Sequence, residues 1–155
     1  MDNELADDIN LFWGLVFEIV TDMEKRLFAF LAEHDLTPPQ FYVLKTLIEH
    51  GGCCRIGQIA TEHHLTNATM TGLVNRLENM QPPLVTRQKS LEDGRSVDVL
   101  LTEEGSARFA AVQHALLNQA SAVLRLLPPQ ERRDAMDKVR FYFKLLVEQF
   151  PVRGQ

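Results

Sequence analysis

The fold is decided by residues 55–101, which read RIGQIATEHHLTNATMTGLVNRLENMQPPLVTRQKSLEDGRSVDVLL. The pattern predicts a short helix over 56–64, a tight link and a second helix over 67–80. Two strands follow over 85–89 and 97–101, joined by a charged turn. This order is typical of a winged helix-turn-helix, in which the second helix enters the major groove of DNA.

The second predicted helix has two distinct faces. Apolar residues recur at i, i+3, i+4 and i+7 and predict a stripe that faces the core, namely Met70, Leu73, Val74 and Leu77. The opposite face carries small and amide side chains, namely Asn67, Ala68, Thr69, Thr71, Gly72, Asn75 and Arg76. Thr66 is a suitable N-cap. Small and amide groups suit close approach to base edges, although an ordinary solvated helix face would look the same.

The predicted hairpin adds a second DNA-reading element. Asp93-Gly94 favours a tight turn, because both residues tolerate positive φ. Arg95 follows the turn and would project from the tip toward a narrow minor groove, while Arg87 and Lys89 would reach phosphates along the strand. We expect Asp93 to orient Arg95 rather than to touch DNA, because phosphates repel a carboxylate. A solvated hairpin with incidental charges is the alternative.

Several motifs occur together, in one order, along nearly the whole chain. They are Leu36-Thr37-Pro38-Pro39-Gln40-Phe41-Tyr42-Val43-Leu44, Ile59-Ala60, Leu73-Val74-Asn75-Arg76-Leu77-Glu78, Leu84-Val85-Thr86-Arg87, Asp93-Gly94-Arg95-Ser96 and Leu100-Leu101-Thr102-Glu103-Glu104-Gly105. With them the sequence resembles the MarR family of bacterial transcriptional regulators. The resemblance implies a homodimer that binds palindromic promoter DNA, usually as a repressor. It also implies a response to a small aromatic or phenolic ligand or to oxidation.

Two features depart from the family pattern. Gln81-Pro82-Pro83 replaces a more flexible turn after the second helix and stiffens the approach to the hairpin. Gly72 stands where many relatives have a larger polar residue, and it costs about 1 kcal/mol of helix stability relative to Ala. Close approach of the backbone to DNA would compensate that cost. The operator preferences of relatives therefore do not transfer directly.

Taken with the resemblance, the residues give two candidate sites. The expected DNA-binding residues are Asn67, Ala68, Thr69, Thr71, Gly72, Asn75, Arg76, Arg87, Lys89, Asp93 and Arg95, with Asp93 acting through Arg95. The candidate lining of a ligand pocket is Trp13, Phe17, Phe41 and Phe109, for each of which core packing is the alternative. No catalytic motif is present, and we expect no enzyme activity, cofactor or bound metal.

The predicted fold class is mainly α with a small β-hairpin wing. We expect one MarR-type domain over 1–155, with the winged helix-turn-helix over 36–101. Helices over 5–34 and 102–150 would form a dimerisation part, because they carry more apolar residues than one small core requires. The first of these helices is predicted over 8–34. Thr37 is an expected N-cap for the next helix, with Gln40 at the capping-box position, and Thr102 is another expected N-cap.

The composition fits specific rather than bulk DNA binding. The 155 residues carry a formal net charge of −5. Residues 55–101 contain five basic and five acidic side chains, so the acidic excess lies outside the candidate DNA-binding part. The sequence has no long apolar run and no signal-peptide pattern, so we expect a cytoplasmic protein with no membrane partner.

Two cysteines and two histidines suggest an alternative function. Cys53-Cys54 and His63-His64 are close in sequence and would serve a regulator that responds to thiol oxidation or to a metal. Adjacent cysteines are poorly placed for a shared metal or an unstrained disulfide, so reduced thiols in a short connecting strand are the simpler expectation. A winged helix that binds only protein partners is a further alternative.

Overall fold

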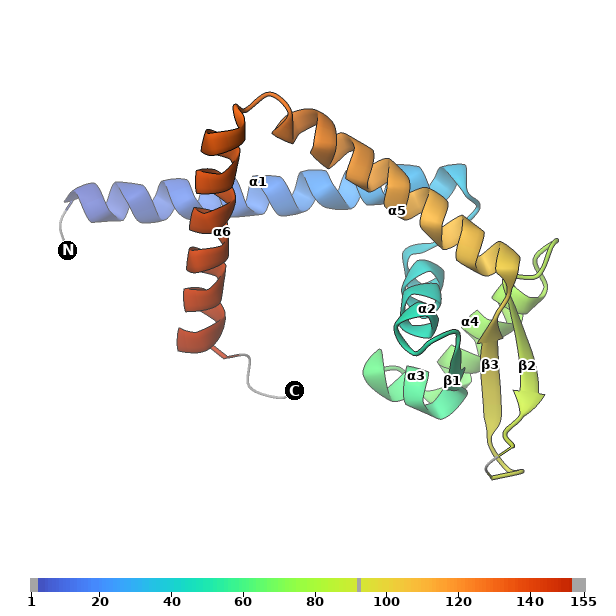
Figure 1. Cartoon of the computed structure of the whole chain (residues 1–155). Coiled ribbons are helices and arrows are strands. Elements are labelled where there is room, and N and C mark those ends of the chain that lie inside the picture. Colours follow the sequence, from blue (N-terminus) through green and yellow to red (C-terminus); the bar gives the residue numbers. More distant parts are fainter. Residues whose placement is uncertain (1–2, 92, 152–155) are drawn as a thin grey trace. The chain divides into compact units, whose positions relative to one another are not determined.

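The computed structural model of the protein describes residues 3–91 and 93–151 (Figure 1). Its elements are α1 (Asn3–Glu33), α2 (Pro38–Glu49), β1 (Cys53–Arg55), α3 (Ile56–Glu62), α4 (Asn67–Glu78), β2 (Val85–Lys89), β3 (Val97–Leu101), α5 (Glu103–Leu124) and α6 (Pro129–Gln149). The chain divides into two compact units, Met1–Leu116 and Leu117–Gln155. The protein is therefore mainly helical with a small antiparallel sheet, which confirms the predicted fold class.

The wing is part of a three-stranded sheet. The strand order is β1-β3-β2, and both pairings are antiparallel. Val85 lies opposite Leu101 and Lys89 opposite Val97, so the two predicted strands pair over their full length. The short connecting strand expected at the cysteine pair is β1, where Cys54 lies opposite Val99. In this order β2 is an edge strand with only β3 beside it.

The core of the first unit confirms the predicted faces of α4. Met70, Val74 and Leu77 are fully buried, and Leu73 is nearly so. They pack in one cluster with side chains from α2, α3, the sheet and α5, among them Leu44, Leu47, Ile59, Val99 and Val112. Burial of this stripe fixes the rotation of α4 and leaves its polar face outward.

Two of the predicted helix starts have the expected caps. At α2, the amide nitrogen of Thr37 donates to Gln40 Oε1 at 2.9 Å in a capping box. At α4, Thr66 Oγ1 accepts a hydrogen bond from the amide nitrogen of Thr69 at 3.2 Å. Both caps satisfy backbone donors that the first helical turn leaves free.

Helix ends differ from prediction by a few residues. α1 begins at Asn3 and ends at Glu33, where Asp35 takes a positive φ of 54°. α3 ends at Glu62 rather than at His64, because His64 also has a positive φ, of 53°. α4 ends at Glu78 rather than at residue 80, with Asn79 as its C-cap. Positive φ at non-glycine residues is compatible with a helix end but not with a continuing helix.

The start of α5 is attached closely to the segment before β2. Thr102 Oγ1 donates to the carbonyl oxygen of Pro83 at 2.7 Å and accepts from the amide nitrogen of Gly105 at 3.0 Å. The amide nitrogen of Thr102 donates to the carbonyl oxygen of Leu84 at 3.1 Å. A Cβ atom at Gly105 would overlap that same Leu84 carbonyl oxygen. The Leu-Thr-x-x-Gly motif thus allows the start of α5 to pack directly against the backbone of Pro83 and Leu84.

Large apolar side chains are exposed on α1 and on α6. On α1 they include Phe12, Trp13, Phe17, Ile19, Val20 and Phe28. On α6 they include Val139, Phe141, Phe143, Leu146 and Val147. Among the described residues, no helix is both long enough and apolar enough to cross a bilayer. Phe17 and Phe143 expose 67% and 68% of their surface. Such exposure is unusual for a phenylalanine in a monomeric protein.

Candidate nucleic-acid interface

The turn between α3 and α4 presents the start of α4 at the surface. The amide nitrogen of Leu65 donates to the carbonyl oxygen of Ala60 at 2.9 Å, which closes α3 tightly. Asn67, Ala68 and Thr69 follow and are exposed. The Thr69 hydroxyl lies 2.9 Å from that of Thr66, so it is shared with the cap in the free protein.

The side chains in the middle of the outer face of α4 are small, so they project little from the helix. Thr71, Gly72 and Asn75 are partly buried, whereas Arg76 is exposed. Among the described residues, no atom beyond the neighbouring backbone of α4 would lie within 4 Å of a Cβ atom at Gly72, so no packing contact requires a glycine there. The absence of a side chain instead lowers the surface of the helix in the middle of its polar face.

Asn75 presents its amide in a particular orientation. Its Oδ1 is buried and has no hydrogen-bond partner among the residues that the structure describes. Pairing with the adenine edge requires both the amide oxygen and the amide nitrogen. In this conformation the buried Asn75 Oδ1 cannot accept from an adenine edge, so adenine pairing would require the side chain to rotate. An unpaired buried oxygen costs about 1–3 kcal/mol, which favours such a change when a donor arrives.

Asp93 orders the tip of the wing. Its Oδ1 accepts from the amide nitrogens of Arg95 and Ser96 at 3.0 and 3.2 Å, and its Oδ2 accepts from Ser96 Oγ at 2.7 Å. These three bonds hold the backbone on both sides of the Arg95 side chain, which is exposed. The neighbouring residue 92 lies outside the described residues.

Arg87 is already engaged in an ion pair. Its Nε donates to Glu78 Oε2 at 2.9 Å, and its Nη2 lies 2.6 Å from the same oxygen. Lys89 lies two residues further along β2 and is exposed. The two basic residues that we expected to reach phosphates therefore differ, because Arg87 has an internal partner on α4.

The four aromatic residues of the candidate ligand pocket form two separate pairs. Phe41 and Phe109 are buried and stack with their ring centroids 4.9 Å apart. Trp13 and Phe17 are exposed on α1, with centroids 5.8 Å apart. The first pair belongs to the core of the winged part, and the second lies on the surface of α1.

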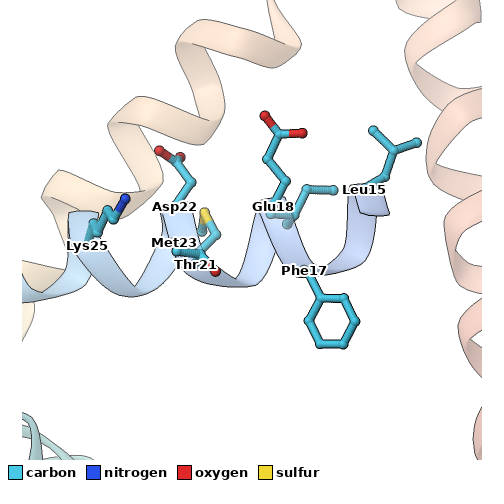
Figure 2. Close-up of a pocket in the computed structure, with 8 residues that line it drawn as sticks. Leu15, Phe17, Glu18, Thr21, Asp22, Met23 and Lys25 are labelled. Atoms are coloured by element: carbon cyan, nitrogen blue, oxygen red, sulfur yellow. The ribbon is translucent and has the colours of Figure 1, made fainter. Parts of the chain in front are cut away.

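A surface hollow runs along α1. Its lining residues all come from one stretch of the helix, Leu15 to Lys25, and include Phe17, Glu18 and Asp22. Figure 2 shows the Phe17 ring directed away from the Glu18 and Asp22 carboxylates. Of the four predicted aromatic residues, only Phe17 lines this hollow.

The cysteine and histidine pairs have ordinary structural roles. Burial raises the pKa of the Cys54 thiol, which disfavours the reactive thiolate, while Cys53 is exposed and both thiols are free. His63 Nε2 lies 2.8 Å from Thr46 Oγ1, and His50 Nε2 lies 2.9 Å from Glu62 Oε1. Among residues 3–91 and 93–151, no three His, Cys, Asp or Glu side chains group as metal ligands.

Sequence patterns did not indicate two of these features and indicated a third only weakly. The Glu78–Arg87 pair joins residues from different elements, and the Asn75 oxygen is buried by tertiary packing. The approach of Gly105 to Leu84 had a weak signal, since a glycine in the first turn of a predicted helix is costly. Such a glycine suggests close backbone contact.

Comparison with known proteins identifies the relatives of this chain. The sequence profile of the MarR family matches residues 36–97. The HTH-type transcriptional regulator YfiV of Bacillus subtilis is 30% identical over 132 residues, which cover 85% of this chain and 81% of YfiV. The HTH-type transcriptional repressor MdtR of the same organism is 28% identical over 110 residues, covering 71% of this chain and 67% of MdtR.

The fold also has solved counterparts. The structure of a MarR family protein from Bacillus stearothermophilus superposes with a TM-score of 0.75 at 23% sequence identity. The match covers 95% of this chain and 99% of that protein.

Proposed function

The chain belongs to the MarR family of DNA-binding transcriptional regulators, and on this premise we propose that it is a homodimeric repressor of a pseudo-palindromic operator. Release would be triggered by a small aromatic or phenolic ligand. The observation that carries the proposal is that the same fold exposes two elements suited to DNA, the polar face of α4 and the tip of the wing. The polar face of α4 is turned outward by burial of its apolar stripe, and the wing tip is held in order by Asp93.

In this proposal α4 is the recognition helix. Asn67, Thr69, Thr71 and Asn75 would meet base edges in the major groove, and Arg76 would meet a phosphate. Ala68 and Gly72 would allow the helix backbone to approach closely. The lowered surface at Gly72 supports this arrangement, because the protein itself makes no use of the missing side chain.

The wing would contact the flanking minor groove. Arg95 is exposed at an ordered tip, so the loop backbone would lose little entropy when its guanidinium enters a narrow groove with a strong negative potential. Lys89 would contact a phosphate nearby. Asp93 would act indirectly, through the three hydrogen bonds that shape the turn.

Dimerisation is supported by the exposed apolar residues of α1 and α6. Such side chains are costly in water, and a second copy of the chain would cover them. A two-fold dimer would place two copies of α4 about one turn of DNA apart, which is the spacing of a palindromic operator. Repression is the action named for the relative MdtR, and bound protein would exclude polymerase from an overlapping promoter.

A reporter gene tests the direction of regulation. A strain would carry the reporter behind a promoter that overlaps the operator selected in vitro, with and without this protein. Repression predicts a lower reporter signal when the protein is present. The variant Arg95→Ala should restore expression. A higher signal with the wild-type protein would mean that it is an activator.

A thermal-shift panel of aromatic acids tests the ligand. Binding at 100 times the dissociation constant stabilises a protein by about 2.7 kcal/mol, which is several degrees in Tm for a chain of this length. Phe17→Ala, in the hollow on α1, should abolish the shift, and Phe28→Ala, on the exposed surface of α1 outside that hollow, should retain it. A panel with no stabilising member would contradict the ligand part of the proposal and leave DNA binding standing.

A further inference from the structure

The Glu78–Arg87 ion pair lies between the two elements that would read DNA. Glu78 is the last residue of α4, and Arg87 is the middle residue of the five-residue strand β2. Both Nε and Nη2 of Arg87 approach one carboxylate oxygen, at 2.9 and 2.6 Å. The side chains expose only 28% and 34% of their surface, so water screens this pair less than a fully exposed one.

The pair supplements a backbone hydrogen bond between the end of α4 and the segment before β2. The amide nitrogen of Leu84 donates to the carbonyl oxygen of Leu77 at 3.0 Å, which brings the chain back against the end of α4 before β2 begins. β2 is an edge strand, and beyond its buried first residue, Val85, its side chains are exposed. Pairing with β3 fixes the direction of β2 within the sheet, and the ion pair links this hairpin to the end of α4 at a second point, three residues beyond Leu84.

A negative charge at the position of Glu78 is electrostatically unfavourable both for α4 and for DNA binding. A carboxylate at the C-terminal end of a helix opposes the helix dipole. On a DNA-binding surface it also repels phosphates. Arg87 offsets both effects, and two of its three guanidinium nitrogens then face Glu78 rather than a phosphate.

We propose that the Glu78–Arg87 ion pair positions the wing relative to the recognition helix, so that α4 and Arg95 engage adjacent grooves at the same time. Arg87 acts as a positioning residue in this account, rather than as a phosphate ligand. The inference rests on the proposed DNA-binding role, and it proposes a positioning role for Arg87 in place of the expected phosphate contact.

The two roles predict opposite signs for one substitution. Glu78→Gln removes a negative charge near DNA, so if the carboxylate only repels phosphates, binding should become tighter. If the carboxylate holds the wing through Arg87, binding should become weaker. The experiment titrates a duplex carrying the selected operator with wild type, Glu78→Gln, Arg87→Gln and the double variant. Each titration is paired with hydroxyl-radical footprinting at several salt concentrations.

Lys89→Gln is the matched control. It removes the same charge from the same strand, two residues along and therefore on the same face of β2, without touching Glu78. Lys89→Gln should reduce the salt dependence of binding by about one ion per protomer while keeping the footprint pattern. Circular dichroism of every variant confirms that the fold is retained.

The expected result is a roughly fivefold loss of affinity for both Glu78→Gln and Arg87→Gln, with no further loss in the double variant. Protection of the flanking minor groove should weaken, and protection of the major-groove half-sites should persist. The charge-swapped variant Glu78→Arg/Arg87→Glu should recover part of the flanking protection. The proposal is overturned if Glu78→Gln binds as tightly as wild type or tighter with an intact footprint.

Hydrogen exchange provides a test that requires no DNA. Amides of β2 and of the wing should exchange faster in Glu78→Gln and in Arg87→Gln than in wild type or Lys89→Gln. Unchanged exchange would overturn the positioning role, whatever the DNA experiment gives. If wild type binds no operator while exchange responds as predicted, the proposed DNA-binding role fails and the structural role of the pair stands.

Discussion

At the scale of single residues, the candidate interface depends on side chains that hold other groups in place. Asp93 shapes the wing tip through three hydrogen bonds, and Glu78 holds Arg87. Both are carboxylates on a surface that would face phosphates. Their presence is explained by the geometry that they impose, which outweighs the local repulsion of DNA.

Arg95→Ala tests the minor-groove contact. We expect binding to weaken by about tenfold at low salt and the salt dependence of binding to fall, because a guanidinium leaves the flanking groove. Fluorescence anisotropy with the selected operator measures both effects. Arg125→Ala removes the same charge outside the winged part and should leave affinity nearly unchanged. Equal affinity of Arg95→Ala and wild type at low and high salt would remove Arg95 from the interface.

His63 predicts a dependence of stability on pH. Burial lowers the pKa of His63 from its usual value of 6.5, with Lys45 lowering it further and Glu62 opposing. The unfolded chain therefore takes up a proton at a higher pH than the folded protein does. Stability from neutral His63 is present above about pH 6.5 and is lost as the pH falls below that value toward the folded pKa.

Urea unfolding at pH 7.5 and pH 5.5 measures this effect. The drop in the free energy of unfolding should be smaller in His63→Gln, which keeps a group able to bond to Thr46 but does not titrate. His64→Asn should behave as wild type, because His64 is exposed and asparagine tolerates its positive φ. The same drop in all three proteins would assign the pH dependence to other groups.

Residue-level prediction from sequence succeeded where the interaction was local. The caps at Thr37, Thr66 and Thr102 join residues three apart, so the sequence spacing contains the geometry. The Glu78–Arg87 pair depends on how residues 79–84 return the chain to the helix end. No pattern of residue types encodes that path, so the pair became visible only in the structure.

At the scale of elements, the start of α5 lies tightly against the segment before β2. Gly105→Ala should destabilise the protein by about 3 kcal/mol, because the new Cβ atom would overlap the Leu84 carbonyl oxygen. Helix propensity alone predicts the opposite sign, since alanine favours a helix by about 1 kcal/mol over glycine. Urea unfolding decides between the two.

Gly72→Ala is the control within the same fold. It has no neighbour to overlap, so it should stabilise the free protein by about 0.5–1 kcal/mol. It should also weaken operator binding, because a methyl group would stand between the helix backbone and the groove. Stabilisation by Gly105→Ala similar to that by Gly72→Ala would contradict the steric account.

The element order and both wing strands were predictable, because apolar periodicity and turn residues carry them. The ends of the helices were less predictable. α1 begins at Asn3, five residues before the start that its apolar stripe indicates, because its first turns are exposed and need no stripe. α4 stops at Glu78, two residues short, although Met80 is apolar and contacts the core.

At the scale of the whole molecule, the account requires two chains on one DNA site. The formal net charge of −5 would repel DNA in bulk, while residues 55–101 are balanced in charge. Affinity must then come from specific contacts made twice, once by each protomer. The exposed apolar surfaces of α1 and α6 are the regions proposed to bring the two copies together.

Selection of binders from a random duplex library, with the purified full-length protein at near-physiological salt, tests this requirement most directly. The account predicts enrichment of an inverted repeat whose half-sites lie about 10 base pairs apart, flanked by A·T-rich positions where Arg95 enters the minor groove. Enrichment of a single unrepeated half-site, or of no sequence, would contradict the central claim that this protein reads DNA as a symmetric dimer.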